Sequence, residues 1–374
     1  MSPEDRQRLS EVRAALRASL KPFGPDYWRD IDEKKLFPTA VFDVMGAAGW
    51  FGTLVPEEHG GAGAGPAVAS VVVDEIGRAG GDATCINAQM SICGTLVRDG
   101  SPEQRKRWLP DVVTGAVRFL TVAATEPDSG ADMTQLESTA VRDGDGWILD
   151  ARKVLISLAE HTRLMILLTR SEEGPTLFLL DLDEVRSRVE IRPVPLVTNR
   201  LTTMVFVDAL RVDDSARLGP PGGGLAALMK GFPVRRALAA AEALGHARFM
   251  LDVSLAHAKT RVTFGRPIGR NQGVQYPLAQ AYARIEAADL MRWDALDLID
   301  AGDPGASGRS ALAKLLASEA AWEMARAALT TFGGWGLAAE YHVERKLRES
   351  TVYLFNNLLW SYVAERVLEL PKAQ

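Results

Sequence analysis

The chain has little cysteine, little excess charge and no long apolar segment. Its two cysteines, Cys85 and Cys93, are spaced as neither a CxxC motif nor a metal-ligand pair, so we expect buried, inert thiols in a reducing compartment and no metal site. A net charge of −5 gives no electrostatic reason to expect a nucleic-acid partner. No apolar run of about 18 residues is free of charge, and the N-terminus carries acids where a signal peptide needs basic residues. We therefore expect a cytoplasmic protein without a membrane span.

Length and composition describe a globular chain. Hydrophobic residues make up 47% of the sequence and charged residues 24%. A chain of 374 residues can bury a sizeable core and is long enough for two or three domains. Changes of hydrophobic periodicity along the chain therefore mark the expected domain boundaries.

The periodicity changes twice. Apolar residues recur every three or four positions over residues 1–117, which predicts an N-terminal α-helical domain. Residues 118–222 hold short β-rich runs without crossover helices, which is typical of an antiparallel barrel or sandwich and not of a parallel nucleotide-binding sheet. Long, Ala-rich amphipathic stretches over residues 223–374 predict a C-terminal helical bundle. The predicted fold is mainly α with a middle β-domain.

Three segments are difficult to explain by packing alone. "AATEPDSGADM" at 123–133 is an ordinary polar turn or a cradle for an anion or a heterocycle edge. "RVTFGRPIGRNQGVQ" at 261–275 gathers three arginines and two amides around a glycine turn, which suits phosphate binding or a solvated interhelical loop. "TFGGWGLAAEYHVER" at 331–345 has three glycines that either admit a flat ligand or end a helix.

Together, this order of domains and these segments resemble the acyl-CoA dehydrogenase family over nearly the whole chain. "PEEHGG", "TEPDSGAD" and "ARKVLIS" are similar to the family's PEE-x-GG, TEP-x-AGSD and GxKxWIT stretches. "RVTFGRPIGRNQ" matches R-x-x-FG-x-PI-x-x-x-Q without a gap, and "GGWGLAAEYHVERKLRE" is similar to a segment with a glycine pair followed by ER-x-x-RD. Members of this family are flavoproteins with a helical N-terminal domain, a middle β-domain and a C-terminal four-helix bundle, and they usually form tetramers.

The resemblance implies FAD as the cofactor, bound in a site with two halves. Ala124 and Thr125 would line the edge of the isoalloxazine ring, and Ser157 would lie beside its N5 atom. The other half would come from a neighbouring subunit and would hold the pyrophosphate and adenine side of the cofactor. The residues implied for that half are Arg261, Phe264, Gln272, Gly333 and Gly334.

The resemblance also implies a catalytic base, but neither place where the family carries it has a carboxylate. One place falls on Asn357, and the other falls on Arg235, directly before Arg236, which the resemblance assigns to substrate binding. An amide or a guanidinium cannot accept a proton near neutral pH. Glu242, about 10 Å along the same helix face from Arg235, is an alternative acid, although a hydrogen-bonded interhelical role also fits it. The base therefore stays unassigned.

The sequence differs from the family pattern at other positions as well. Asn356 and Asn357 equally fit a helix start, as capping or hydrogen-bonding groups. Ala131, Leu155 and Thr330 replace a serine, a tryptophan and a glutamine of the family pattern, and each change removes one contact to the flavin. The residues that would serve a partner's FAD are intact.

Three functions fit these features. The first is FAD-dependent α,β-dehydrogenation of an acyl thioester, either an acyl-CoA or an acyl-carrier protein, by an unusual or relocated base. Electron-transfer flavoprotein or oxygen would then be the acceptor. The second is a base-less partner subunit of a hetero-oligomeric acyl-CoA dehydrogenase, and the third is a flavin-dependent oxygenase on the same fold. We expect a homo- or hetero-oligomer, either a dimer or a tetramer.

Overall fold

The chain divides into two compact units, which are described separately. The computed structural model describes residues 3–130, 132 and 135–372, so Ala131 lies outside the described residues. The bundle unit contains Met1–Lys34, Ala64–Ala83 and Pro233–Gln374, and the sheet unit contains Lys35–Gly63 and Thr84–Phe232. Helices of residues 1–117 occur in both units. The division into three domains stays a prediction.

The sheet unit joins short helices to one mixed β-sheet. Its helices are α3 (Thr39–Ala47), α5 (Thr84–Asp99), α6 (Pro102–Thr114), α7 (Leu182–Val185) and α8 (Gly224–Lys230). Its strands are β1 (Phe119–Ala123), β2 (Thr139–Asp143), β3 (Gly146–Ser157), β4 (Leu164–Ser171), β5 (Gly174–Asp181), β6 (Val189–Pro193), β7 (Thr202–Asp213) and β8 (Arg217–Leu218). β4 and β5 read as nearly continuous apolar runs because most of their side chains are buried.

The sheet is open, so the barrel alternative is wrong. The strand order is β6-β7-β3-β2-β4-β5-β8, with β1 beside β4. Among the described residues, the end strands β6 and β8 do not pair with each other. β1 and β2 both pair with β4 in parallel, so the sheet is not purely antiparallel. The β2–β3 hairpin supplies the long connection that the parallel β1–β4 pair needs.

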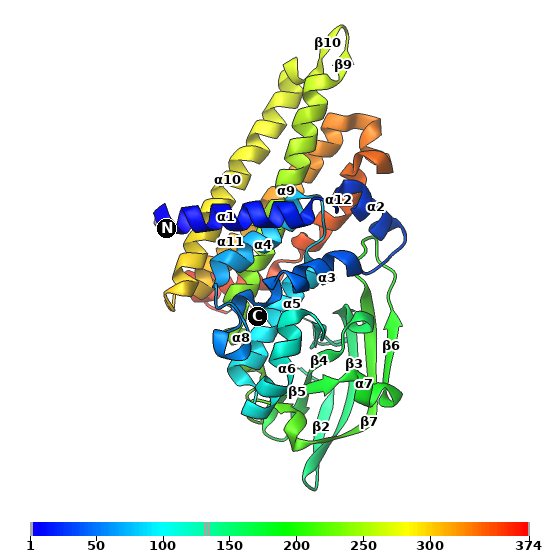
Figure 1. Cartoon of the computed structure of the whole chain (residues 1–374), viewed down its shortest axis with the longest axis vertical. Helices are drawn as coiled ribbons and strands as arrows, with labels where there is room; N and C mark the ends of the chain where they lie inside the picture. Colours follow the sequence, from blue (N-terminus) through cyan, green and yellow to red (C-terminus); the bar gives the residue numbers. More distant parts are fainter. Residues whose placement is uncertain (1–2, 131, 133–134, 373–374) are drawn as a thin grey trace. The chain divides into compact units, whose positions relative to one another are not determined.

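The bundle unit is built around three long helices, and α9 and α10 form an extended hairpin (Figure 1). Its helices are α1 (Pro3–Leu20), α2 (Pro25–Glu33), α4 (Pro66–Arg78), α9 (Phe232–Thr260), α10 (Gln272–Asp300), α11 (Ala306–Phe332), α12 (Val343–Ser350) and α13 (Asn357–Tyr362). Two short strands, β9 (Val262–Thr263) and β10 (Arg266–Pro267), form the tip of the α9–α10 hairpin. Alanines fill much of the core and let these helices pack closely.

Helices α4 and α9 cross at a pair of glycines. A Cβ atom on Gly245 would lie 2.3 Å from the carbonyl oxygen of Asp74, and one on Gly77 would lie 2.9 Å from the backbone of Gly245. Both clashes are with main-chain atoms, which cannot move aside as a flexible side chain can. The crossing therefore requires glycine at both positions.

None of the described helices is both long enough and apolar enough to cross a membrane.

Candidate functional site

A buried ion pair in the sheet unit links two of the sequence motifs. Lys153 of β3 is 0% exposed, and its Nζ donates to Glu126 Oε1 at 2.6 Å and to the Ala124 carbonyl at 3.2 Å. Glu126 also accepts backbone N–H bonds from Glu137 at 2.6 Å and Ser138 at 3.1 Å. Burial would raise the pKa of Glu126, but the bond from Lys153 lowers it below its usual value. Ala124 and Glu126 are thus fixed to strand β3.

Hydrogen bonds to their carbonyl groups hold the predicted flavin-edge residues at the ends of strands β1 and β3. The backbone N–H of Val154 donates to the Thr125 carbonyl at 3.0 Å, and the hydroxyl of Thr121 donates to the Ser157 carbonyl at 3.0 Å. Ala124, Thr125 and Ser157 are all partly exposed. The structure therefore holds these three residues along β1 and β3, where a ligand can reach them.

Leu155 lies at an irregular point of strand β3, two residues before Ser157. Its φ is +53°, a left-handed conformation that is uncommon for a leucine, and the register with β7 shifts between Lys153 and Ile156. Its side chain is 60% exposed. Leu155 therefore presents an apolar side chain to the outside at the position where the family pattern has tryptophan.

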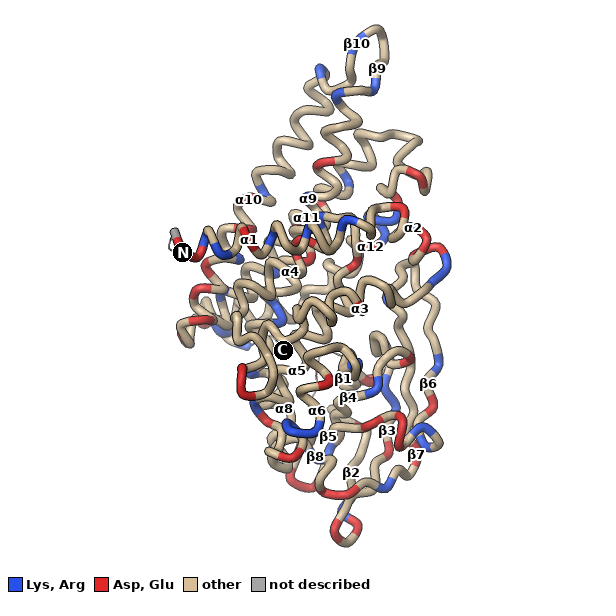
Figure 2. The backbone as a smooth tube through the Cα atoms, in the orientation of Figure 1, with Lys and Arg blue, Asp and Glu red and all other residues tan. Residues whose placement is uncertain are grey.

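The second predicted set of residues gathers at the tip of the bundle unit. Arg261, Phe264 and Gln272 are exposed there, and Phe264 is 99% exposed with a φ of +52°. The backbone N–H of Ile268 donates to the Arg261 carbonyl at 2.9 Å and closes the hairpin. Figure 2 shows basic residues at this tip. A fully exposed phenylalanine beside arginines has no packing role within its own chain.

Gly333 and Gly334 lie at the same end of the bundle unit. They follow Phe332, which stacks on His257 of α9 with ring centroids 4.0 Å apart. Gly333 has a φ of +60°, and a Cβ on either glycine would meet no atom within 4 Å. The glycines therefore leave open space beside the tip, as the cofactor prediction requires.

The two adjacent amides have different environments. Asn356 is 6% exposed; its Nδ2 donates to the Tyr353 carbonyl at 2.7 Å, and its Oδ1 accepts from Lys314 Nζ. Asn357, the first residue of α13, is exposed. The Asn356 carbonyl accepts from the N–H of Leu359 at 2.8 Å. The hydrogen-bonding role at a helix start is confirmed for Asn356, although neither amide forms a side-chain capping bond to α13.

Glu242 belongs to the same buried group as Asn356. It is 6% exposed on α9, and the Tyr353 hydroxyl donates to its Oε1 at 3.4 Å. Burial and then Arg236 lower the pKa of Lys314 to about 8, while Glu242 opposes that shift. The interhelical hydrogen bond expected for Glu242 is therefore present, and Lys314 of α11 lies within electrostatic reach of it.

Arg235 and Arg236 are half-buried near the start of α9. Arg236 Nη1 donates to the Ser307 carbonyl at 3.2 Å, and its guanidinium lies over the Tyr362 ring at 4.7 Å. Burial lowers the pKa of Arg236. The bundle unit therefore brings together Arg236, Glu242, Asn356 and the unforeseen Lys314, but it places Asn357 outside this group. A lone lysine in the apolar helical stretch "SALAKLLAS" was the available signal for Lys314.

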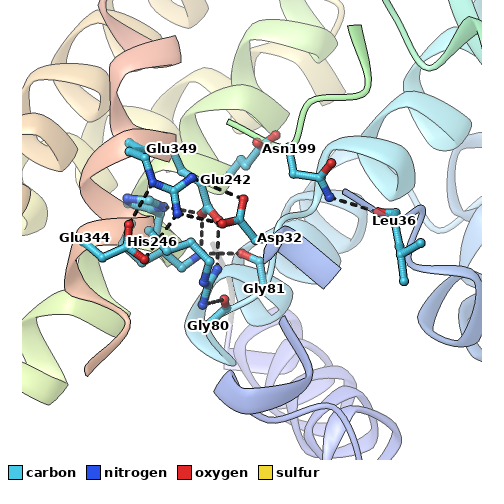
Figure 3. Close-up of polar contacts among 12 residues, drawn as sticks. Asp32, Leu36, Gly80, Gly81, Asn199, Glu242, His246, Glu344 and Glu349 are labelled. Atoms are coloured by element: carbon cyan, nitrogen blue, oxygen red, sulfur yellow. Dashed lines mark hydrogen bonds and ion pairs between the residues drawn. The ribbon is translucent and has the colours of Figure 1, made fainter. Parts of the chain in front are cut away.

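A second buried group surrounds Glu349 (Figure 3). Its carboxylate pairs with Arg345 Nη1 and Lys346 Nζ, each at 2.8 Å, and lies 3.6 Å from His246 Nδ1. Lys346 also donates to the Gly81 carbonyl at 2.7 Å. Burial and then Lys346 lower the pKa of His246 to about 4, so this imidazole is neutral at pH 7. These contacts fix α12 to the segment after α4.

Family models match the chain along most of its length. The N-terminal, middle and C-terminal domains of acyl-CoA dehydrogenase match residues 2–116, 121–208 and 222–356. Acyl-CoA dehydrogenase FadE12 of Mycobacterium tuberculosis (strain ATCC 25618 / H37Rv) is 32% identical over 99% of this chain and 97% of its own. Cyclohex-1-ene-1-carbonyl-CoA dehydrogenase of Geobacter metallireducens is 28% identical over 99% of both chains. The chain therefore belongs to the acyl-CoA dehydrogenase family.

Solved structures agree with this assignment. The glutaryl-coenzyme A dehydrogenase–glutaryl-CoA complex superimposes with a TM-score of 0.92 at 27% identity, covering 100% of this chain and 97% of that one. The family consists of flavin oxidoreductases, which confirms the expected class of enzyme and its FAD cofactor. The residues present fit that cofactor, because the tip leaves Phe264 uncovered and Gly333 and Gly334 open.

Proposed function

We propose that this protein oxidises an acyl thioester to its α,β-enoyl product. The observation that carries the proposal is the grouping of the predicted flavin residues. Within the sheet unit, Ala124, Thr125 and Ser157 are partly exposed at the ends of β1 and β3, where hydrogen bonds to their carbonyl groups hold them. Within the bundle unit, the second set is confined to one exposed tip and the adjoining glycines. Family membership over the whole chain supports assigning both groups to FAD.

Each group has a separate task in this proposal. FAD, when bound, supplies the oxidant that accepts the two electrons of the substrate. Ala124, Thr125 and Ser157 would orient its ring system, and Arg261 and Gln272 would bind its phosphate and adenine side from a second copy. Phe264 would then be covered by that copy's cofactor, which removes a large apolar side chain from water. Arg236 would bind the thioester substrate, whose carrier is coenzyme A or a carrier protein.

The alternative of a base-less partner subunit is favoured by one observation. Asn357 is exposed and Arg235 is a cation, so neither position offers a proton acceptor. In that case the tip would complete the FAD site of a catalytic relative in a mixed oligomer. The oxygenase alternative has no comparable support from a described residue.

The flavin test separates these functions. We expect the purified protein to bind FAD as an oligomer, and its flavin absorbance to be bleached anaerobically by at least one member of a panel of acyl-CoAs and acyl-carrier proteins. Arg261→Gln should lower the bound FAD, whereas Lys259→Gln, two residues earlier on α9, should leave it unchanged. A protein that takes up no FAD, or whose flavin no thioester bleaches, would contradict the dehydrogenase and leave the partner subunit.

A further inference from the structure

We propose that Glu242 is the proton acceptor of this protein, with Tyr353 and Lys314 as its positioning residues. This inference rests on the proposed dehydrogenation, which requires removal of an α-proton. It is carried by the group of polar side chains on α9, on α11 and in the segment directly before α13, hereafter the amide cluster. The cluster consists of Arg236, Glu242, Lys314, Tyr353 and Asn356.

The chemistry of the amide cluster leaves one group able to accept a proton near neutral pH. The guanidinium of Arg236 and the amide of Asn356 cannot do so, and the Tyr353 hydroxyl serves as the hydrogen-bond donor to Glu242. With a pKa of about 8, Lys314 is mostly an ammonium at pH 7. Glu242 is the carboxylate of the cluster, and a carboxylate can act as a general base.

The neighbours of Glu242 hold its carboxylate in a fixed place. The Tyr353 hydroxyl donates to Oε1, and the same segment continues to Asn356, which binds the Lys314 ammonium. The ammonium of Lys314 lies within electrostatic reach of this carboxylate. The segment that carries the two amides therefore contacts Glu242 through Tyr353 and Lys314 through Asn356, and it positions an acid that the segment itself lacks.

Exposure within the amide cluster is graded, which gives a direction of approach. Arg236 and Lys314 are half-buried, whereas Glu242, Tyr353 and Asn356 are buried. A thioester entering beside Arg236 would meet the Lys314 end first and Glu242 last. Glu242 lies six positions after Arg236 on α9, which is about 9 Å along the helix axis. The carrier would thus lie near Arg236, and the α-carbon would lie deeper, at Glu242.

The proposed step is balanced by the oxidant already assigned to the protein. The α C–H bond breaks, its proton goes to a Glu242 carboxylate oxygen, and its electron pair stays on the acyl chain to form the new C=C bond. FAD, when bound, would accept the β-hydrogen together with its electron pair. The products are the enoyl thioester, the reduced flavin and protonated Glu242, which returns its proton to solvent.

The test measures removal of the α-proton separately from reduction of the flavin. In D2O, NMR of the panel acyl-CoA that bleaches the wild-type flavin should show α-hydrogen exchange catalysed by the FAD-loaded protein. Glu242→Gln should lower that exchange at least 100-fold, the scale of general-base catalysis, with unchanged FAD content and thioester binding. Glu319→Gln, which removes an exposed carboxylate of α11, should exchange like the wild type.

Further variants keep the test decisive. If Glu242→Gln does not fold, Glu242→Asp should fold and retain reduced exchange, because it keeps the acid on a shorter side chain. Tyr353→Phe should lower exchange less than Glu242→Gln and shift its pH profile, as expected of a positioning residue. Bleaching and exchange that survive Glu242→Gln would overturn the assignment while leaving the dehydrogenase intact, and loss on Lys314→Met alone would make Lys314 the acceptor. A wild type that neither exchanges nor bleaches would refute the dehydrogenase itself.

Discussion

Acid should destabilise this protein through one buried imidazole, His246. Burial and the neighbouring Lys346 lower the pKa of His246 from 6.5 to about 4. Between these two pH values the unfolded chain binds a proton that the folded chain does not, so the free energy of unfolding falls as the pH falls through this window. A pKa difference of roughly 2.5 units corresponds to about 3 kcal/mol, lost between pH 6.5 and pH 4.

His246→Gln isolates this contribution. Glutamine stays neutral, so the variant should lose about 3 kcal/mol less than the wild type between pH 6.5 and pH 4. The pKa of His342 is also lowered to about 4, but His342 is present in both proteins and cancels in the difference. The assay is urea unfolding at a series of pH values with FAD held at one concentration. Parallel stability curves for the two proteins over this window would refute the reasoning.

Two further substitutions test packing and the flavin side of the sheet. Lys153→Met leaves the buried Glu126 carboxylate without its ammonium, and we expect a loss of about 3–5 kcal/mol in urea unfolding together with lower FAD content; an unchanged stability would show that the backbone N–H bonds to Glu126 suffice. Gly245→Ala places a Cβ 2.3 Å from the Asp74 carbonyl and should cost about 1–3 kcal/mol. Gly273→Ala on α10 meets no atom within 4 Å and should be neutral or slightly stabilising, so equal effects at the two glycines would contradict the close crossing.

Local patterns predicted the order of the elements well. The change to β-rich runs near residue 118 agrees with β1 beginning at Phe119, and the return of helices after residue 222 agrees with α8 beginning at Gly224. These boundaries are visible in sequence because periodicity and turn residues act over a few positions. The open edge of the sheet was not predictable in this way, because it depends on which strands pair across long separations.

The buried ionic groups show the same limit of sequence reasoning. Lys153 and Glu126 are 27 residues apart, and nothing local to either motif indicates that they meet. Lys314 and Asn356 are 42 residues apart on different helices. In each case the only local signal was a lysine, Lys153 or Lys314, among apolar residues. That signal does not identify the residue that pairs with the lysine. The residues of the exposed tip were easier to find, because they lie within one short stretch.

The two amides are best understood through this difference between local and distant contacts. In the sequence, Asn356 and Asn357 are one pair of neighbours. In the structure, helix α13 begins at Asn357, and only the side chain of Asn356 is buried. The inward amide accepts from the Lys314 ammonium and thereby leaves that charge available to Glu242, whereas an acid at the same position would neutralise Lys314 directly. The absence of a carboxylate at Asn356 and the presence of one at Glu242 are thus electrostatically linked. The amide pair is therefore consistent with a displaced acid and does not by itself indicate a lost one.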